Sequence, residues 1–159
     1  MAAHPSTFVN FTLEQRQTFS PVGLRALFAQ ETAFKLSEAE LLRLLGGVTR
    51  PDMKEWKRAA LAKESITLPN DTLNRVRGAL VIFQATLKRF PKSHERAEEW
   101  LRKPHHAPLF GGKSPITLMM DANPEGMANV VRYVQIQNTL PDPKKATAKP
   151  IRRKKSENA

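Results

Sequence analysis

The stretch from Ala107 to Ser114 has the spacing of a phosphate-binding loop, because a lysine and a serine follow two glycines at its end. In such loops, backbone N–H groups and the lysine hold phosphates, and the loop joins a buried strand to a helix. Here alanine stands where the first glycine belongs, basic residues precede the loop, and Pro115 follows Ser114 directly. No apolar run ending in aspartate supplies a magnesium ligand. The pattern therefore argues against nucleotide binding.

Histidines and glutamates are the other candidates for metal binding or acid–base catalysis. His105 and His106 are adjacent and point different ways, and no spaced carboxylate or cysteine completes a ligand set with His94. Three glutamates lie beside Arg96 and Arg102 on one expected helix, as on a solvated charged face. They are Glu95, Glu98 and Glu99. We expect no catalytic residue, no metal site and no cofactor, so the chain is predicted not to be an enzyme.

The charge of the chain favours an anionic partner. The 159 residues contain 26 lysines and arginines against 15 acidic residues, a formal net charge of +11. This excess favours nucleic acid first, or an acidic protein surface, whereas simple solubility is the bland explanation. The charge is concentrated near the end, where seven basic residues stand against Asp142 and Glu157. Residues 138–159 have no apolar periodicity and are predicted to form a basic disordered tail. Its basic residues are Lys144, Lys145, Lys149, Arg152, Arg153, Lys154 and Lys155.

The absence of cysteine excludes a disulfide framework and any thiolate metal site. It fits a reducing cytosol. The first ten residues lack a basic segment leading into an apolar run, and no stretch approaches the roughly 18 apolar residues of a membrane span. We therefore expect a cytoplasmic protein without a signal peptide or a membrane segment, associated with the nucleoid when bound to DNA.

Apolar residues recur at helical spacing along most of the chain, and no alternating run is long enough for a strand. Helix starts are marked by capping residues, several of them followed by proline. The predicted starts are Ser20, Ser37, Thr49, Asn70 or Asp71, Ser93, Ser114 and Asn123. Gly46–Gly47 and Pro91 are predicted to end helices. These patterns predict an all-α protein whose residues 1–19 form an irregular N-terminal arm.

Residues 37–61 have the layout of a helix-turn-helix, because two short helices meet at a Gly46-Gly47-Val48 turn. In that motif the second helix enters the major groove of DNA by its N-terminal end. Arginine can read guanine bidentately, and lysine mostly supplies charge toward phosphates. The residues expected to bind DNA are Thr49, Arg50 and Lys54, near base edges, and Lys57 and Arg58, near phosphates.

An ordinary helical hairpin with a solvated face explains the same spacing. Asp52 and Glu55 would be repelled by DNA phosphates, and Pro51 takes the place of a side chain that could donate a hydrogen bond. From composition and spacing alone, both interpretations of residues 37–61 stay open.

A longer string in the second half of the chain is more specific. Trp100-Leu101-Arg102 is followed by Pro104, by Ala107-Pro108-Leu109-Phe110-Gly111-Gly112 and by Ser114-Pro115. This order resembles the C-terminal half of the Xre/MbcA/ParS antitoxins. Leu118-Met119, Gly126 and Val130 to Tyr133 are similar to the closing helices of that family. The N-terminal helix-turn-helix of the family is similar to residues 37–50 together with Trp56-Lys57-Arg58. The resemblance therefore covers roughly residues 20–137.

The resemblance implies an Xre-like helix-turn-helix domain at residues 20–65 and a small helical toxin-binding domain at residues 67–137. It implies an antitoxin of a type II toxin–antitoxin pair, which binds a RES-class, NAD-degrading toxin and represses its own operon by binding operator DNA. The last helix and its end would lie over the NAD pocket of the toxin. A homodimer, or a higher complex with the toxin, is expected. The basic tail and the Pro51-Asp52 step depart from the family pattern.

The expected toxin-binding residues are Leu109, Phe110, Met120, Arg132 and Tyr133. A loop restricted by prolines loses little entropy on binding, and tyrosine and arginine are frequent binding anchors. Phe110 has a second interpretation, in which its ring fills the core of the chain itself. The alternative function is a helix-turn-helix regulator that binds nucleic acid and has no toxin partner. A neighbouring gene for a RES-type protein would separate the two functions.

Overall fold

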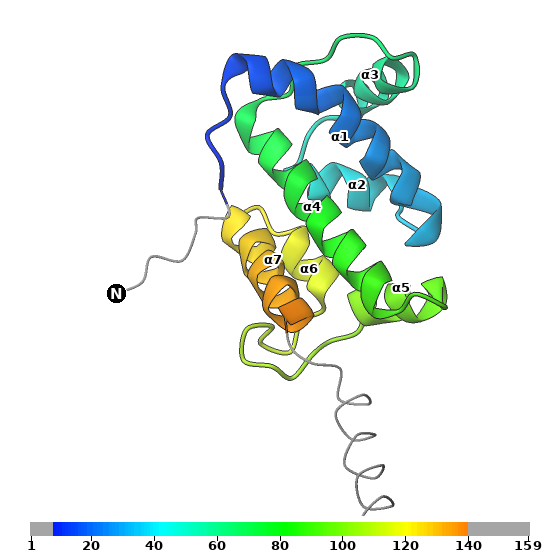
Figure 1. The fold of residues 1–159 in the computed structure, drawn as a ribbon, viewed down its shortest axis with the longest axis vertical. Coiled ribbons are helices and arrows are strands. Elements are labelled where there is room, and N and C mark those ends of the chain that lie inside the picture. Colours follow the sequence, from blue (N-terminus) through cyan, green and yellow to red (C-terminus); the bar gives the residue numbers. More distant parts are fainter. Residues whose placement is uncertain (1–7, 140–159) are drawn as a thin grey trace, which may run out of the picture.

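The computed structural model describes residues 8–139, and this part of the chain contains seven α-helices and no β-strand (Figure 1). The predicted all-α class is therefore confirmed for these residues. The helices are α1 (Leu13–Ala33), α2 (Glu38–Leu44), α3 (Arg50–Leu61), α4 (Asn70–Arg89), α5 (His94–Arg102), α6 (Pro115–Met119) and α7 (Pro124–Thr139). The first two residues of the predicted tail belong to α7. The rest of that tail, like residues 1–7 of the predicted arm, lies outside the described residues.

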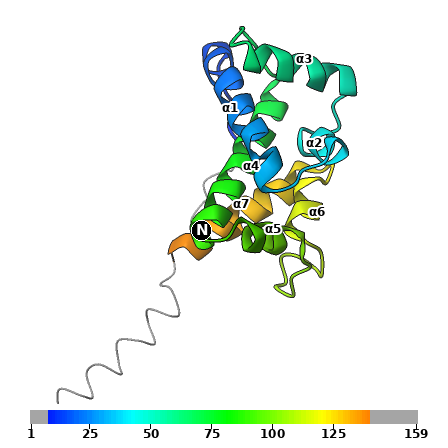
Figure 2. The same ribbon diagram turned by 90° about the vertical axis from the view of Figure 1, so that its right-hand side faces the viewer.

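Helix α4 runs through the middle of the structure, with α1 to α3 on one side and α6 and α7 on the other (Figures 1 and 2). Phe83 of α4 stacks on Phe34 at the end of α1, with ring centroids 4.6 Å apart. On the side of α7, Gly78 makes room for Met127, because a Cβ at Gly78 would lie 2.9 Å from the Met127 Cγ. The expected boundary after Ser65 falls between α3 and α4, yet side chains from both sides of it share one hydrophobic core.

Helix α1 begins at Leu13, seven residues before the predicted start at Ser20. The Thr12 side chain accepts a hydrogen bond from the Gln15 N–H, and the Gln15 side chain accepts one from the Thr12 N–H, which is a capping box. Ser20 lies inside the helix, where its hydroxyl donates to the Arg16 carbonyl and accepts from the Leu68 N–H. The prediction of an irregular arm is therefore wrong for residues 13–19.

Residues 8–11 form an extended arm that two asparagines hold against α4. The Asn74 side chain accepts from the Val9 N–H and donates to the Val9 carbonyl, both at 2.7 Å. The Asn70 side chain accepts from the Phe11 N–H at 2.9 Å. Pro69 therefore occupies the N-cap of α4 without a side-chain hydrogen bond, and the predicted cap at Asn70 or Asp71 is wrong.

The turn between α2 and α3 follows the predicted pattern. The Gly47 N–H donates to the Leu42 carbonyl and the Gly46 N–H to the Arg43 carbonyl, which is a Schellman end to α2. Both glycines have positive φ angles, 99° and 78°, which side chains with a Cβ rarely adopt. Thr49 then caps α3, because its side chain accepts from the Asp52 N–H. Two short helices thus meet at a tight turn.

Arg102 of α5 connects the second half of the chain to the first. Its guanidinium donates to both oxygens of Glu40 in α2, at 2.7 and 3.1 Å, and to the carbonyls of Phe34 and Lys35. The hydrogen bonds from Arg102 lower the pKa of Glu40, and the same contacts raise the pKa of Arg102. Rotation of α5 against α2 would break this bidentate pair.

The corner between α6 and α7 depends on Gly126. A Cβ built at this position would lie 2.3 Å from the carbonyl oxygen of Leu118, far inside van der Waals contact. The backbone of α7 therefore passes directly over the end of α6. This close approach fixes where the rest of α7 begins.

Candidate functional site

The loop between α5 and α6, residues 103–113, carries the most specific part of the sequence. Helix α5 begins at the Ser93 cap, and α6 begins at the Ser114 cap with proline in its first turn, both as predicted. The His105 N–H donates to the Lys113 carbonyl at 3.2 Å, so the loop closes on itself. The sequence therefore builds a short, closed loop between two capped helices.

Phe110 fills the inside of this loop, and only 1% of its surface is exposed. Its ring packs edge-on against Tyr133 of α7, with centroids 4.9 Å apart, and lies 5.1 Å from the His105 ring. Trp100 of α5 lies over the same group, 6.5 Å from Phe110 and 6.4 Å from Tyr133. These four rings form what we call the aromatic cluster: Trp100, His105, Phe110 and Tyr133. The cluster holds the loop against α7.

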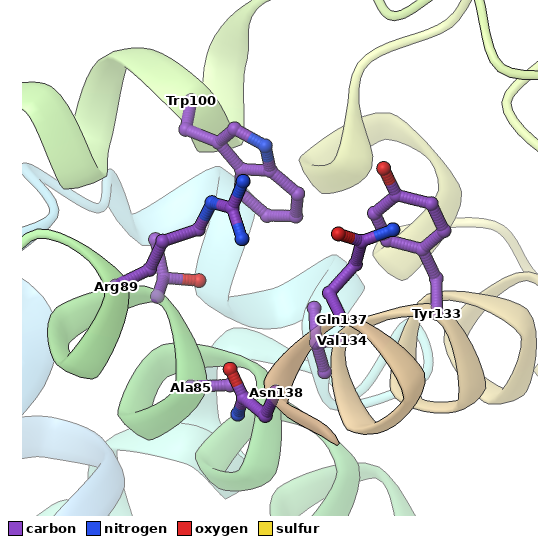
Figure 3. A pocket seen from close by; sticks show the side chains of 8 residues that line it. Ala85, Arg89, Trp100, Tyr133, Val134, Gln137 and Asn138 are labelled. Atoms are coloured by element: carbon purple, nitrogen blue, oxygen red, sulfur yellow. The ribbon is translucent and has the colours of Figure 1, made fainter. Parts of the chain in front are cut away.

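A small pocket opens beside the aromatic cluster, between the ends of α4 and α7. Its volume is about 30 Å³, enough for an ordered water molecule. Arg89 and Trp100 face Gln137 and Tyr133 across it (Figure 3). The other lining residues are Ala85, Thr86, Val134 and Asn138. We call this site the Arg89 pocket.

Sequence reasoning missed Arg89, Gln137 and Asn138. A signal was present, because Gln137 follows Tyr133 by four residues and so lies on the same face of α7. For Arg89 the spacing gave no comparable signal, since its neighbours in the pocket come from α5 and α7.

The predicted toxin-binding residues occupy three different places. Phe110 and Tyr133 come together in the aromatic cluster, and Leu109, the neighbour of Phe110, stays 37% exposed. Met120 is half-buried at the end of α6 and packs against the core. Arg132 pairs with Glu125 at 3.2 Å and with Asn129, and it lines another cleft. The five residues therefore do not form one continuous patch.

The cleft lined by Arg132 lies between α7, α4 and the turn before α3, and its volume is about 540 Å³. Arg75 is buried at its wall and donates to the carbonyls of Asp121 and Ala122, both at 2.9 Å. Burial lowers the pKa of Arg75. The cleft also has acidic residues in its lining, Asp71 and Glu125. Opposite charges therefore share the wall of this cleft.

The predicted DNA-binding residues lie on or next to α3, and all but Lys54 are already engaged within the chain. The Thr49 side chain caps the helix, and Arg50 forms an ion pair with Glu38. Lys57 pairs with Glu31 at 2.7 Å, and its ammonium group also lies over the ring of Phe28. Lys54 is exposed and has no ion pair with any described residue.

Arg58, the fifth of these residues, is held by two carboxylates. Glu55 and Glu64 both accept hydrogen bonds from its guanidinium, at 2.6 and 2.5 Å. These contacts raise the pKa of Arg58, and Arg58 lowers the pKa of Glu55. A phosphate would have to compete with both carboxylates for this side chain.

Comparison of the sequence with known proteins identifies a family domain in the second half of the chain. Residues 89–135 match the C-terminal toxin-binding domain of the Xre/MbcA/ParS antitoxins. The chain is also 31% identical over 117 residues to the uncharacterized protein y4oB of Sinorhizobium fredii (strain NBRC 101917 / NGR234), which covers 74% of this chain and 84% of that protein. Residues 89–135 are a toxin-binding domain of the Xre/MbcA/ParS antitoxin family. The resemblance stated from the sequence is confirmed for this part of the chain.

The match to this antitoxin domain coincides with the candidate site. It begins at Arg89, the last residue of α4, and ends at Gln135 in α7, less than one helical turn before Asn138. The whole aromatic cluster therefore lies within the toxin-binding domain. Helices α1 to α3, with the predicted DNA-binding residues, lie before the matched residues.

Two further observations concern residues 8–139 only. None of their helices is long and apolar enough to cross a membrane. Within the same range, no three side chains of histidine, aspartate or glutamate come together in a way that could hold a metal ion.

Proposed function

We propose that this chain is the antitoxin of a type II pair and that it neutralises a RES-class, NAD-degrading toxin. The toxin binds the face formed by the loop of residues 103–113 and by α7. Inhibition is steric, because α7 covers the NAD pocket of the toxin. The chain itself has no catalytic role, and the complex acts in the cytoplasm.

One observation carries this proposal: the family's toxin-binding domain coincides with the aromatic cluster and its exposed rim. Phe110 holds the loop rigidly from inside, while Leu109 remains exposed beside it. Tyr133 is half-buried, so part of its ring is open to a partner. A preorganised loop loses little entropy when it binds, and large aromatic side chains often anchor interfaces.

The test is neutralisation in cells. The chain is expressed together with the RES-domain protein encoded by the adjacent reading frame, and growth and NAD content are measured. The wild type restores both, whereas Tyr133→Ala and Arg132→Ala reduce neutralisation at least tenfold, judged by the amount of antitoxin needed. Lys54→Ala, on α3, serves as the matched control and neutralises like the wild type.

Circular dichroism and thermal melts of the two variants separate binding from folding, because both must keep the helicity of the wild type. Full neutralisation by Tyr133→Ala and Arg132→Ala would contradict the proposed interface. NAD loss that the wild type does not prevent would contradict the antitoxin function itself.

The second part of the proposal is repression of the operon by α2 and α3, acting in a homodimer. The supporting observations are the tight turn and the capped start of α3, which present Thr49, Arg50 and Lys54 at one helix end. The ion pairs of Arg50, Lys57 and Arg58 oppose tight binding, because each must be exchanged for a contact with DNA. We therefore expect modest affinity that depends strongly on salt.

A further inference from the structure

The Arg89 pocket is rich in hydrogen-bond donors. The Arg89 guanidinium forms no ion pair or hydrogen bond with any described residue, although it lies at the mouth of the pocket. The indole N–H of Trp100 and the side-chain amides of Gln137 and Asn138 likewise have no partner within residues 8–139. The one hydroxyl with a described partner is that of Thr86, which donates to the Ile82 carbonyl at 2.6 Å. No aspartate or glutamate lines the pocket.

We propose that the Arg89 pocket binds a single carboxylate, the side chain of an aspartate or glutamate on the toxin. A carboxylate only accepts hydrogen bonds, so it matches the unpaired guanidinium of Arg89, and the side chains of Trp100, Gln137 and Asn138 in the same lining carry further N–H groups. Arginine binds planar carboxylates through two parallel hydrogen bonds. The proposal rests on the proposed function, because it names the group of the toxin that this face recognises.

The charges around the pocket favour an anion. Lys88 precedes Arg89 in the last turn of α4, and Lys92 and Arg96 follow it in the chain. None of the four forms an ion pair with a described carboxylate. Both α4 and α7 end beside the pocket, and each helix end brings a partial charge of about −0.5. The full charge of Arg89 lies in the pocket lining itself. Glu95 and Glu99 lie nearby on α5, and Glu99 already pairs with Lys103.

The lining of the Arg89 pocket distinguishes it from the wide cleft on the other side of α7. Arg89 is the one charged residue in the described lining of the pocket. In the wide cleft, Arg75 and Arg132 share the lining with Asp71 and Glu125, and Arg132 already pairs with Glu125. An entering carboxylate would meet two acidic side chains in the cleft and none in the Arg89 pocket. The Arg89 pocket is therefore the better carboxylate site of the two.

Peptide titration of the isotope-labelled full chain tests the chemistry without the toxin. The probe is the capped peptide acetyl-Gly-Asp-Glu-Asp-Gly-amide, and its matched control replaces the acids with asparagine and glutamine. We expect the acidic peptide to shift the NMR signals of the Trp100 indole and the Gln137 amide in a saturable way. Trp56 in α3 is the internal reference and stays unshifted. The control peptide shifts neither tryptophan.

Two variants sharpen this test. Arg89→Gln removes the charge at an exposed helix end, so the fold is kept, and we expect at least tenfold weaker binding of the acidic peptide. Arg43→Gln is the matched control, because Arg43 is also an exposed arginine in a last helical turn without a described carboxylate partner. It leaves the affinity within twofold of the wild type.

Three results would overturn the proposal: no shift of Trp100 at millimolar peptide, equal shifts with the uncharged peptide, or a larger shift with a short single-stranded DNA at equal charge. The last would assign the pocket to nucleic acid. With the RES-domain protein of the adjacent frame, Arg89→Gln is expected to weaken the complex at least tenfold. Unchanged binding of the toxin to this variant would contradict the inference alone, whereas no binding to the wild type would contradict the proposed function.

Discussion

Neighbouring residues of the loop between α5 and α6 have opposite environments. The ring of Phe110 is enclosed by Trp100, His105 and Tyr133, while the side chain of Leu109 faces solvent. The two interpretations of Phe110 are therefore decided in favour of the core. Because Phe110 is buried, it can affect toxin binding only by fixing the conformation of the loop, whereas Leu109 can contact a partner directly.

We predict that Phe110→Ala lowers the free energy of unfolding by about 3–5 kcal/mol, because the truncation leaves a cavity in a closed ring cluster. Leu109→Ala should lower it by less than about 1 kcal/mol, because 37% of the Leu109 surface is already exposed, while weakening binding of the toxin. Urea unfolding of both variants checks the prediction. Equal loss of stability in the two variants would contradict the assignment of Phe110 to the core.

At the scale of the element, the lysines of α3 differ in whether they are paired within the chain. Lys54 is exposed without an ion pair to any described residue, whereas Lys57 is tied to Glu31 of α1 and lies 5.3 Å from the centre of the Phe28 ring. Lys57 therefore helps to hold α3 on α1. Lys54 is available to a partner.

The sequence placed Lys54 near base edges and Lys57 near phosphates, but Lys57 is paired with Glu31, so the free charge on this helix is that of Lys54. We predict that Lys54→Ala weakens binding to DNA of every sequence and lowers the slope of log affinity against log salt by about one unit. Lys57→Ala should change that slope less than Lys54→Ala does. It should lower the thermal stability instead, because it removes the ion pair between α3 and α1. Titration of DNA with the two variants at several salt concentrations measures the slopes. An identical slope for the wild type and Lys54→Ala would rule out contact between Lys54 and DNA phosphate.

The helices could be predicted largely from their ends. Ser37, Thr49, Ser93 and Ser114 are N-caps, as their residue types indicate, because each side-chain oxygen accepts from a backbone N–H three residues on. The predicted start of α1 was wrong. The Ser20-Pro21 step has the residue types of a helix start, but the capping box at Thr12 begins the helix further upstream. Both Thr12 and Ser20 carry capping signals in the sequence, and only the packing of the folded chain decides which of them begins the helix.

The candidate site was predictable only in part. Trp100 and Tyr133 belong to the recognisable family string, and the structure brings their rings together. Arg89 and Asn138 are separated by 48 intervening residues and meet because α4 and α7 pack side by side and end together. Such a meeting depends on tertiary packing, which no short pattern of residues encodes.

At the scale of the whole molecule, one bidentate ion pair ties the toxin-binding domain to α2. Arg102 holds both oxygens of Glu40, and this contact lowers the pKa of the Glu40 carboxyl. A carboxyl with a lowered pKa stabilises the fold above its unfolded pKa, about 4.3, and the stabilisation is lost as the pH falls through the lower folded pKa. The attachment of the two halves should therefore weaken in acid.

We predict that Glu40→Gln lowers the free energy of unfolding at pH 7 by about 1.5–3 kcal/mol, the range for a hydrogen bond to a charged group. The difference from the wild type should shrink as the pH falls below the unfolded pKa of about 4.3, because the lowered pKa delays protonation of the Glu40 carboxyl in the folded state. Urea unfolding at pH 7 and pH 3 measures this. Glu55→Gln is the control, because its pair with Arg58 is exposed and contributes little. A difference that is the same at both pH values would contradict the role of the ion pair.

Gly126 controls the lining of the Arg89 pocket from a distance. Any other residue there would place a carbon on the Leu118 carbonyl oxygen, so α7 would have to move away from α6. Tyr133 and Gln137 lie about two and three turns further along α7, and a shift at its start would carry both out of the Arg89 pocket. The pocket therefore keeps its shape only while a residue outside its lining remains a glycine.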